Sequence, residues 1–328
     1  MARVFFDGFE SGDVINFETI YQDGSGNCFA TAAFGDFTGS YVMKTQWQAY
    51  ARKSITAAAS YYFAFKFKYE SSNTCCLFSW LKATALLGYI TRDTTTGLLK
   101  AYVGTSLVAT STKYLNTTDT YLVELYVSIA DSGGRIVVKV NGITEIDYTG
   151  DTQPSTDTTI DKFGLGDNGN RIGGGAYYDD IIVDDAAWIG NTKIQAIVPT
   201  GAGTTTAWTP STGSNYACVD EKPASDTDYV STNTSDNVDT YAMGNMSGTI
   251  GLVKSVKAQC RAKYEGTPTP TKLKLVIRSG GADYVGADHT VTTAYSFFFD
   301  LWNLDPADSA VWTDTKVNAL EAGVKAIA

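Results

Sequence analysis

The chain has 328 residues, 44% of them hydrophobic and only 18% charged, so it can bury cores of ordinary domain size and does not have the composition of a disordered protein. Its formal net charge of −10 argues against a surface that binds nucleic acid. The first residues, MARVFFDGFESGD, are acidic where a signal peptide is apolar, and no run of about 18 apolar residues occurs. We therefore expect no membrane insertion, and synthesis in the cytoplasm of the producing cell.

Alternation of apolar and polar residues predicts β-strands through the first part of the chain. Residues 61–69, YYFAFKFKY, place aromatic side chains on one face of a strand. Asn141-Gly142 separates two further runs and predicts a hairpin, because both residues of such a turn need positive φ. The predicted strands cover residues 61–69, 86–90, 98–103, 121–130, 135–140, 143–148 and 176–184.

A change of composition predicts a domain boundary. Residues 199–206, PTGAGTTT, are small and turn-prone, as linkers are, and divide the chain into domains 1–198 and 199–328. Apolar residues three or four apart in 313–328 predict a short amphipathic helix at the end. The second domain has predicted strands within residues 240–246, 250–263, 272–278 and 294–299.

Three segments of the first domain, taken in order, resemble the concanavalin A-like, laminin-G-type jelly roll. They are FFDGFESG at residues 5–12, SGGRIVVKVNG at 132–142 and YDDIIV at 178–183. The resemblance, joined to the strand pattern, implies an all-β protein of two β-sandwich domains. The first is a concanavalin A-like jelly roll, and the second is a smaller sandwich ending in a short helix.

Segments of the second domain resemble structural proteins of tailed bacteriophages. They are WTP at residues 208–210, DTDYV at 226–230, DP at 305–306 and WTDTKVNALEAGV at 312–324. The resemblance implies a virion protein, either a capsid decoration protein or head fibre or a minor tail component. Its expected partners are the major capsid or tail proteins and further copies of itself in a homo-oligomer.

A second interpretation stays open beside the virion protein. It is a lectin-like carbohydrate-binding module, with host-surface or environmental glycans as ligands and no virion role. The two are compatible, because a protein on a particle surface can also bind sugars. Four aromatic residues, Trp47, Tyr50, Trp80 and Tyr89, could stack on sugar rings, although most aromatic residues of a sandwich form its core.

One pair of carboxylates has the spacing of a catalytic site. Glu145 and Asp147 alternate along a predicted strand, as carboxylates do in jelly-roll glycoside hydrolases. Thr149 stands where a third carboxylate would follow, and His289, the single histidine, has no preceding G-x-S-x-G motif. We therefore predict no catalytic residue and no enzymatic activity.

Carboxylates of the opening and closing strands predict a metal site. In the jelly roll that this chain resembles these strands are neighbours, so Asp7, Glu10 and Asp180 are candidate ligands of a structural Ca²⁺ ion. No other cofactor is expected. The glycine-rich residues 164–175 lack the Lys-Ser/Thr ending of a phosphate loop and predict turns instead. Five cysteines without CxxC spacing predict free thiols.

Overall fold

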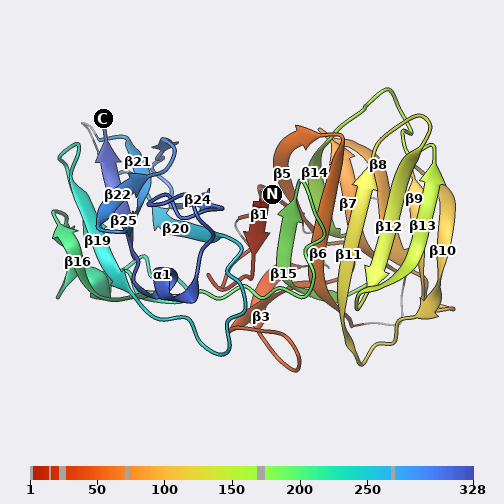
Figure 1. Ribbon diagram of the computed structural model, residues 1–328, viewed down its shortest axis with the longest axis horizontal. Coiled ribbons are helices and arrows are strands. Elements are labelled where there is room, and N and C mark those ends of the chain that lie inside the picture. The colour runs from red at the N-terminus through yellow and green to blue at the C-terminus, as the bar shows by residue number, and fades with distance from the viewer. Residues whose placement is uncertain (1–2, 15, 22–26, 71–73, 168–173, 267–269) are drawn as a thin grey trace. The chain divides into compact units, whose positions relative to one another are not determined.

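The computed structural model describes residues 3–14, 16–21, 27–70, 74–167, 174–266 and 270–328 (Figure 1). Nearly all regular structure is β, and the chain divides into two compact units, Met1–Ile194 and Gln195–Ala328. The predicted fold class, all-β with two β-sandwich domains, is confirmed. The division falls between Ile194 and Gln195, whereas the sequence placed the boundary between residues 198 and 199.

Unit 1 is a sandwich of two antiparallel sheets, as a jelly roll requires. The eight-stranded sheet has the order β13-β12-β11-β6-β15-β4-β3, with β1 also paired to β15, and the seven-stranded sheet has the order β10-β9-β8-β7-β14-β5-β2. The strands of the first sheet are β1 (Arg3–Asp7), β3 (Cys28–Ala32), β4 (Tyr41–Thr45), β6 (Ser60–Tyr69), β11 (Thr120–Ser128), β12 (Gly134–Val140), β13 (Ile143–Gly150) and β15 (Ala176–Asp184). Those of the second are β2 (Thr19–Tyr21), β5 (Tyr50–Ala58), β7 (Cys75–Lys82), β8 (Ala85–Arg92), β9 (Leu98–Val103), β10 (Ser106–Tyr114) and β14 (Ile160–Gly166).

Aromatic side chains from both sheets form the core of unit 1. Phe63 and Phe65 of β6 meet Phe78 of β7 at ring-centroid distances of 4.6 and 5.7 Å, and Phe78 stacks on Phe163 of β14 at 5.8 Å. All four are buried, and burial of such a ring contributes about 1.5–3 kcal/mol. Because side chains alternate along a strand, this packing directs the intervening residues of β7 and β14 away from the core.

Unit 2 is the smaller sandwich. Its main sheet has the order β16-β19-β25-β21-β22 with β23 on β21, and β20 pairs with β24. Trp312, Leu275 and Ile277 lie in its core, against which side chains of β20 and β24 pack. Its elements are β16 (Pro199–Thr206), β17 (Thr209–Pro210), a 3-10 turn (Asn215–Cys218), β18 (Val230–Ser231), β19 (Val238–Met243), β20 (Val256–Ala262), β21 (Lys272–Ser279), β22 (Ala282–Val285), β23 (His289–Thr290), β24 (Ser296–Trp302), α1 (Asp314–Asn318) and β25 (Glu321–Ile327). Within the described part of the chain, no helix has the length and apolarity to cross a membrane.

The predicted linker at residues 199–206 is a strand. These residues form β16, which pairs with β19 and alternates between half-buried and exposed positions. Thr204 donates its backbone N–H to Glu321 over 2.7 Å, so this edge strand is also tied to β25. Small polar residues can therefore form a strand here because the neighbouring sheet supplies the hydrogen-bond partners.

The short helix near the C-terminus is confirmed, but it is shorter than the spacing predicted. It spans Asp314–Asn318 and begins at Thr313, whose side chain accepts the N–H of Lys316. Residues Glu321–Ile327 instead form β25, which pairs with β19 on one edge and β21 on the other. Hydrogen bonds along both edges outweigh the weak helical preference of this segment.

Candidate functional site

One row of residues crosses five adjacent strands of the seven-stranded sheet. Tyr102 of β9 pairs with Tyr89 of β8, Tyr89 with Ser79 of β7, Ser79 with Gly164 of β14, and Gly164 with Arg52 of β5. We call these five residues the cross-strand row. In each strand the residues immediately before and after the row are buried, so strand alternation points the row to the face of the sheet opposite the aromatic core. At the usual strand spacing its ends lie roughly 19 Å apart.

Two tyrosines form one end of the cross-strand row. The rings of Tyr89 and Tyr102 stack with centroids 4.6 Å apart and planes 8° apart. Tyr102 is half-buried, and Tyr89 is 6% exposed. Burial raises the pKa of Tyr89, so its hydroxyl is protonated at neutral pH and can donate a hydrogen bond. An aromatic face with a polar tip suits a ligand that has both C–H and hydroxyl groups.

A cation held against aromatic rings forms the other end. The guanidinium of Arg52 lies 4.2 Å from the ring centroid of Tyr50, and Tyr50 stacks on Tyr21 of β2 at 5.0 Å. Gly164 makes room beside it: a Cβ there would lie 2.7 Å from Ser79 Oγ and 3.2 Å from Arg52 Cγ. A guanidinium fixed in this way presents a planar set of donors that matches a carboxylate.

Ser79, at the centre of the row, is a buried polar residue. Its side chain is 0% exposed, and no described residue forms a hydrogen bond with its Oγ. Most buried hydroxyls in folded proteins are hydrogen-bonded, and leaving one without a partner costs about 1–3 kcal/mol. Such a cost in the middle of a polar row marks the row as a candidate binding site.

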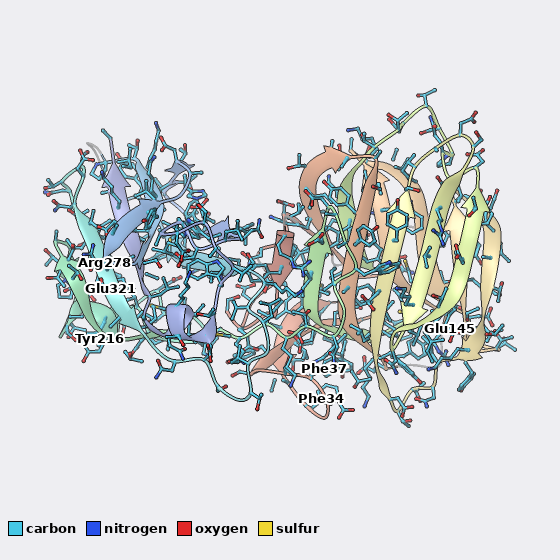
Figure 2. The ribbon with its side chains drawn as sticks, viewed as in Figure 1. Phe34, Phe37, Glu145, Tyr216, Arg278 and Glu321 are labelled. Atoms are coloured by element: carbon cyan, nitrogen blue, oxygen red, sulfur yellow. The ribbon has the colours of Figure 1, made fainter. Side chains whose placement is uncertain are left out.

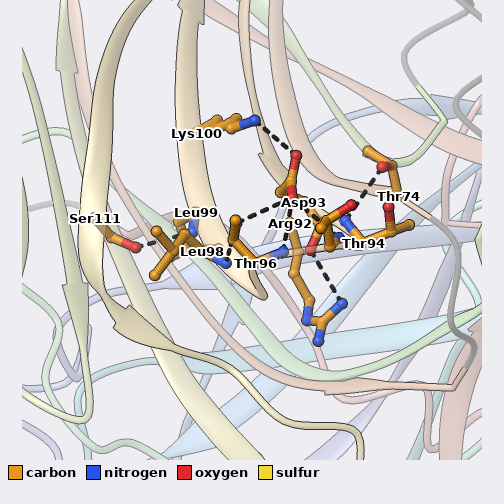
Figure 3. A network of polar contacts seen from close by, with 10 residues as sticks. Thr74, Arg92, Asp93, Thr94, Thr96, Leu98, Leu99, Lys100 and Ser111 are labelled. Carbon is orange, nitrogen blue, oxygen red and sulfur yellow. Dashed lines mark hydrogen bonds and ion pairs between the residues drawn. The ribbon is translucent and has the colours of Figure 1, made fainter.

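A hydrogen-bonded hairpin holds the tyrosine end of the row in register. Asp93, after β8, accepts hydrogen bonds from Thr96 N over 2.9 Å and from Lys100 Nζ over 2.6 Å (Figure 3). The hydrogen bond from Lys100 lowers the pKa of Asp93. Ser111 of β10 accepts the N–H of Leu99 over 2.9 Å, which extends the network to a third strand. The turn thereby fixes the pairing of β8 with β9 and the stacking of their tyrosines.

The carboxylates that suggested a glycosidase do not act as a pair. A register shift in β12 and β13 interrupts the alternation, and Glu145 (labelled in Figure 2) accepts hydrogen bonds from Thr112 Oγ1 and Lys113 N of β10. Asp147 binds Arg135 of β12 through both its oxygens, at 2.7 and 2.8 Å. The hydrogen bond from Arg135 lowers the pKa of Asp147. Glu145 therefore binds groups of β10, whereas Asp147 binds a side chain of β12.

The three predicted calcium ligands also contact protein groups. Asp7 accepts hydrogen bonds from a backbone N–H and an asparagine side chain, and Glu10 from two backbone N–H groups. Asp180 lies 3.0 Å from Lys66 Nζ and accepts the N–H of Ile194. In the described ranges, no three His, Cys, Asp or Glu side chains are grouped as metal ligands. The calcium site stays a prediction to which this geometry adds no support.

The remaining candidates from the sequence are dispersed. His289 lies in β23 with Nε2 3.0 Å from Asp300 Oδ2, and residues 168–173 of the glycine-rich segment lie outside the described residues. Trp80 is fully buried in the core, and Trp47 is 57% exposed. The described cysteines are free thiols.

Sequence reasoning missed most of the cross-strand row. It named Tyr89, and Tyr50 beside the row, but not Arg52, Ser79 or Tyr102. The available signal was a polar residue between apolar neighbours in a predicted strand, as in the FSW of β7. That signal indicates that the residue points away from the core. Its neighbour on the adjoining strand depends on the pairing of strands that are distant in the chain.

The chain is similar to parts of several solved structures of carbohydrate-active proteins. One is a sialidase, at 14% identity and a TM-score of 0.44 over 56% of this chain, and the chain spans only 18% of it. Another is the endo-β-1,4-glucuronan lyase of the fungus Trichoderma reesei, at 11% identity and a TM-score of 0.44 over 56% of this chain and 96% of that one. A third is the carbohydrate-binding module CBM66 of Bacillus subtilis, at 10% identity and a TM-score of 0.33 over 48% of this chain and 92% of that one.

These similarities concern the fold. No protein-family model matches the sequence, and no curated protein matches it. The prediction that the chain is not an enzyme is corrected by these neighbours, because they include a sialidase and a polysaccharide lyase. The absence of activity was predicted from a few motifs, the Glu145/Asp147 pair and the G-x-S-x-G motif among them, whereas one sandwich fold can carry unrelated sites. The neighbours are carbohydrate-active sandwich proteins, and none of the comparisons bears on a virion.

Proposed function

We propose that unit 1 binds an acidic polysaccharide across the cross-strand row. The observation that carries the proposal is the register that aligns two stacked tyrosines, a buried hydroxyl, a glycine and a guanidinium on five adjacent strands of one sheet. The row is roughly 19 Å long, which is the length of a short oligosaccharide and not of a single sugar.

Each side chain of the row has a role that follows from its chemistry. Tyr102, the half-buried tyrosine of the stacked pair, offers its ring and hydroxyl to a sugar ring, and Tyr89 packs against it. Arg52 binds a carboxylate of the ligand, and its contact with Tyr50 holds the guanidinium in place. Ser79 contributes a hydroxyl that gains a hydrogen-bond partner when a ligand reaches it. Because Ser79 is buried, ligand entry requires a neighbouring side chain to move aside.

The test is calorimetric titration of the whole chain with oligomers of uronic acids and with neutral oligomers of similar length. We expect binding of a uronic acid oligomer and about a tenfold or greater loss in Arg52→Ala, since an ionic hydrogen bond contributes about 1.5–3 kcal/mol. Arg135→Ala is the matched control, because Arg135 lies on the other sheet and pairs with Asp147. Binding that is absent, or equal in Arg52→Ala and the parent, overturns the proposal.

The same samples test catalysis. A lyase acting on a uronic acid polymer leaves an unsaturated sugar at the new chain end, which absorbs ultraviolet light. Appearance of that absorbance, lost in Arg52→Ala, would make the row an active site. Binding without any product would define it as a binding face.

The virion role is a separate proposal whose support is the sequence resemblance of residues 208–210, 226–230, 305–306 and 312–324. It includes location in the particle, capsid or tail proteins as partners, and a homo-oligomer. Mass spectrometry of purified particles tests the location, and light scattering of the isolated chain tests the oligomer. Absence from the particles would remove the virion role and leave the glycan-binding proposal untouched.

A further inference from the structure

A cavity of about 560 Å³ lies at one end of the unit 1 sandwich and shares no residue with the cross-strand row. Val103 and Ser106 line it from β9 and β10 of the seven-stranded sheet. Tyr148 lines it from β13 of the other sheet, and Asp151 and Pro154 from the segment that follows. The cavity therefore opens between the two sheets, where the β9–β10 turn faces the segment after β13.

Two glycines shape the walls of this cavity. Gly104, in the β9–β10 turn, has a φ of +54°, and a Cβ there would lie 3.1 Å from Pro154 Cβ. A Cβ on Gly150 would lie 2.5 Å from the hydroxyl of Tyr148, so the absence of a side chain lets that ring fold back along its strand. The Tyr148 hydroxyl then donates to the carbonyl of Asp151 over 3.3 Å. Backbone geometry thus holds both sides of the cavity in place.

The lining combines apolar surface with hydroxyl and carboxylate groups. Leu86, Val103 and Pro154 are apolar, while Ser106 and Asp151 are polar. Asp151 Oδ1 accepts the N–H of Gln153 over 2.8 Å, and no hydrogen bond from a described residue reaches Oδ2. Asp151 carries the single carboxylate of the lining, and none of the described lining residues is a lysine or arginine. A free carboxylate oxygen with no cation beside it accepts hydroxyl protons and repels anions.

We propose that this cavity is a second ligand site, which binds a neutral, hydroxyl-rich molecule of one or two sugar rings. The volume lies in the range of small-molecule sites, which are mostly apolar with a few placed polar groups. Asp151 accepts hydrogen bonds from ligand hydroxyls, and the apolar wall contacts the C–H face of the ring. The site differs from the cross-strand row in ligand charge, and it does not depend on the function proposed for that row.

The test uses the full chain and a panel of glucose, galactose, mannose, cellobiose and lactose, observed by saturation-transfer NMR and calorimetry. We expect at least one of these sugars to bind with a Kd on the order of millimolar. Asp151→Asn should weaken that binding about tenfold or more, because it removes the charge from the hydrogen bonds. Asn can still accept the Gln153 N–H, so the turn is retained.

Three further variants make the result decisive. Ser106→Phe places a ring in the cavity from an exposed strand position and should abolish sugar binding without lowering the unfolding temperature. Asp36→Asn changes an exposed carboxylate of unit 1 that does not line the cavity, and it should leave binding unchanged. Arg52→Ala should also leave it unchanged, which separates this site from the cross-strand row. No binding by any sugar, or binding unaltered in both Asp151→Asn and Ser106→Phe, overturns the proposal.

Discussion

Replacing Ser79 by alanine should stabilise the protein. The Ser79 hydroxyl is fully buried and has no hydrogen-bond partner among the described residues, so folding removes it from water without compensation. The cost of such a group is about 1–3 kcal/mol, and alanine avoids it while removing a single oxygen atom. We therefore expect Ser79→Ala to raise the free energy of unfolding of unit 1 by about 1–2 kcal/mol. For a domain of this size that corresponds to roughly 2–4 °C in Tm per kcal/mol.

Ser111 provides the matched control. It is a buried serine in the same sheet, but its hydroxyl accepts the N–H of Leu99 over 2.9 Å and donates to the Lys113 carbonyl over 3.1 Å. Ser111→Ala leaves those groups without a partner and should lower the free energy of unfolding by about 1–2 kcal/mol. Urea unfolding and calorimetry of the full chain would measure both variants. If Ser79→Ala loses as much stability as Ser111→Ala, the hydroxyl has a partner in the folded protein and the argument fails.

Further predictions concern the row, pH and unit 2. Gly164→Ala should cost about 1–3 kcal/mol and weaken glycan binding, since the new Cβ would lie 2.7 Å from Ser79 Oγ. Gly201→Ala, whose Cβ would meet no atom closer than 3.8 Å, should cost less, and equal losses in urea unfolding would contradict the steric argument. Burial, and then the adjacent carboxylate of Asp180, raise the pKa of Asp179 to about 8, so the folded protein keeps a proton that the unfolded chain loses above the ordinary carboxyl pKa of 3.8. The stabilisation is therefore complete below pH 3.8 and is lost as the pH rises towards 8, and Asp179→Asn should flatten this fall in urea unfolding at several pH values. An unchanged slope in the variant would show that Asp179 titrates normally. Trp312→Ala should lower the stability of unit 2 by about 3–5 kcal/mol, because Trp312 is fully buried, and calorimetry should show the unit 1 transition unmoved.

The sequence predicted strands correctly where the alternation of apolar residues and the turn residues indicate the same element. Residues 61–69 lie within β6, with the aromatic residues of its odd positions buried. Asn141 and Gly142 have φ values of +52° and +81°, as the predicted hairpin turn requires. In these segments, burial on one face and turn geometry point to the same structure, and both can be read from adjacent residues.

The errors lie where distant strands decide the local structure. Residues 199–206 have the composition of a linker, but β19 offers them an edge to pair with. Residues Glu321–Ile327 have helical spacing, but the chain places them between β19 and β21, where they pair on both edges. Glu145 and Asp147 are two residues apart, yet a register shift sends them to different partners. None of these outcomes is encoded within the segment concerned.

Alternation and turn residues are local properties of the sequence, and they predicted an all-β protein of two domains, while the sandwich architecture was implied by the resemblance to the jelly roll. Which residues become neighbours across the sheet depends on the pairing of distant strands. Arg52, Ser79 and Tyr102 come from strands that are not consecutive along the chain, and the order β9-β8-β7-β14-β5 places them in one row. Sheet register depends on the summed packing of the whole core, because a one-residue shift in any strand would turn its member of the row to the opposite face of the sheet.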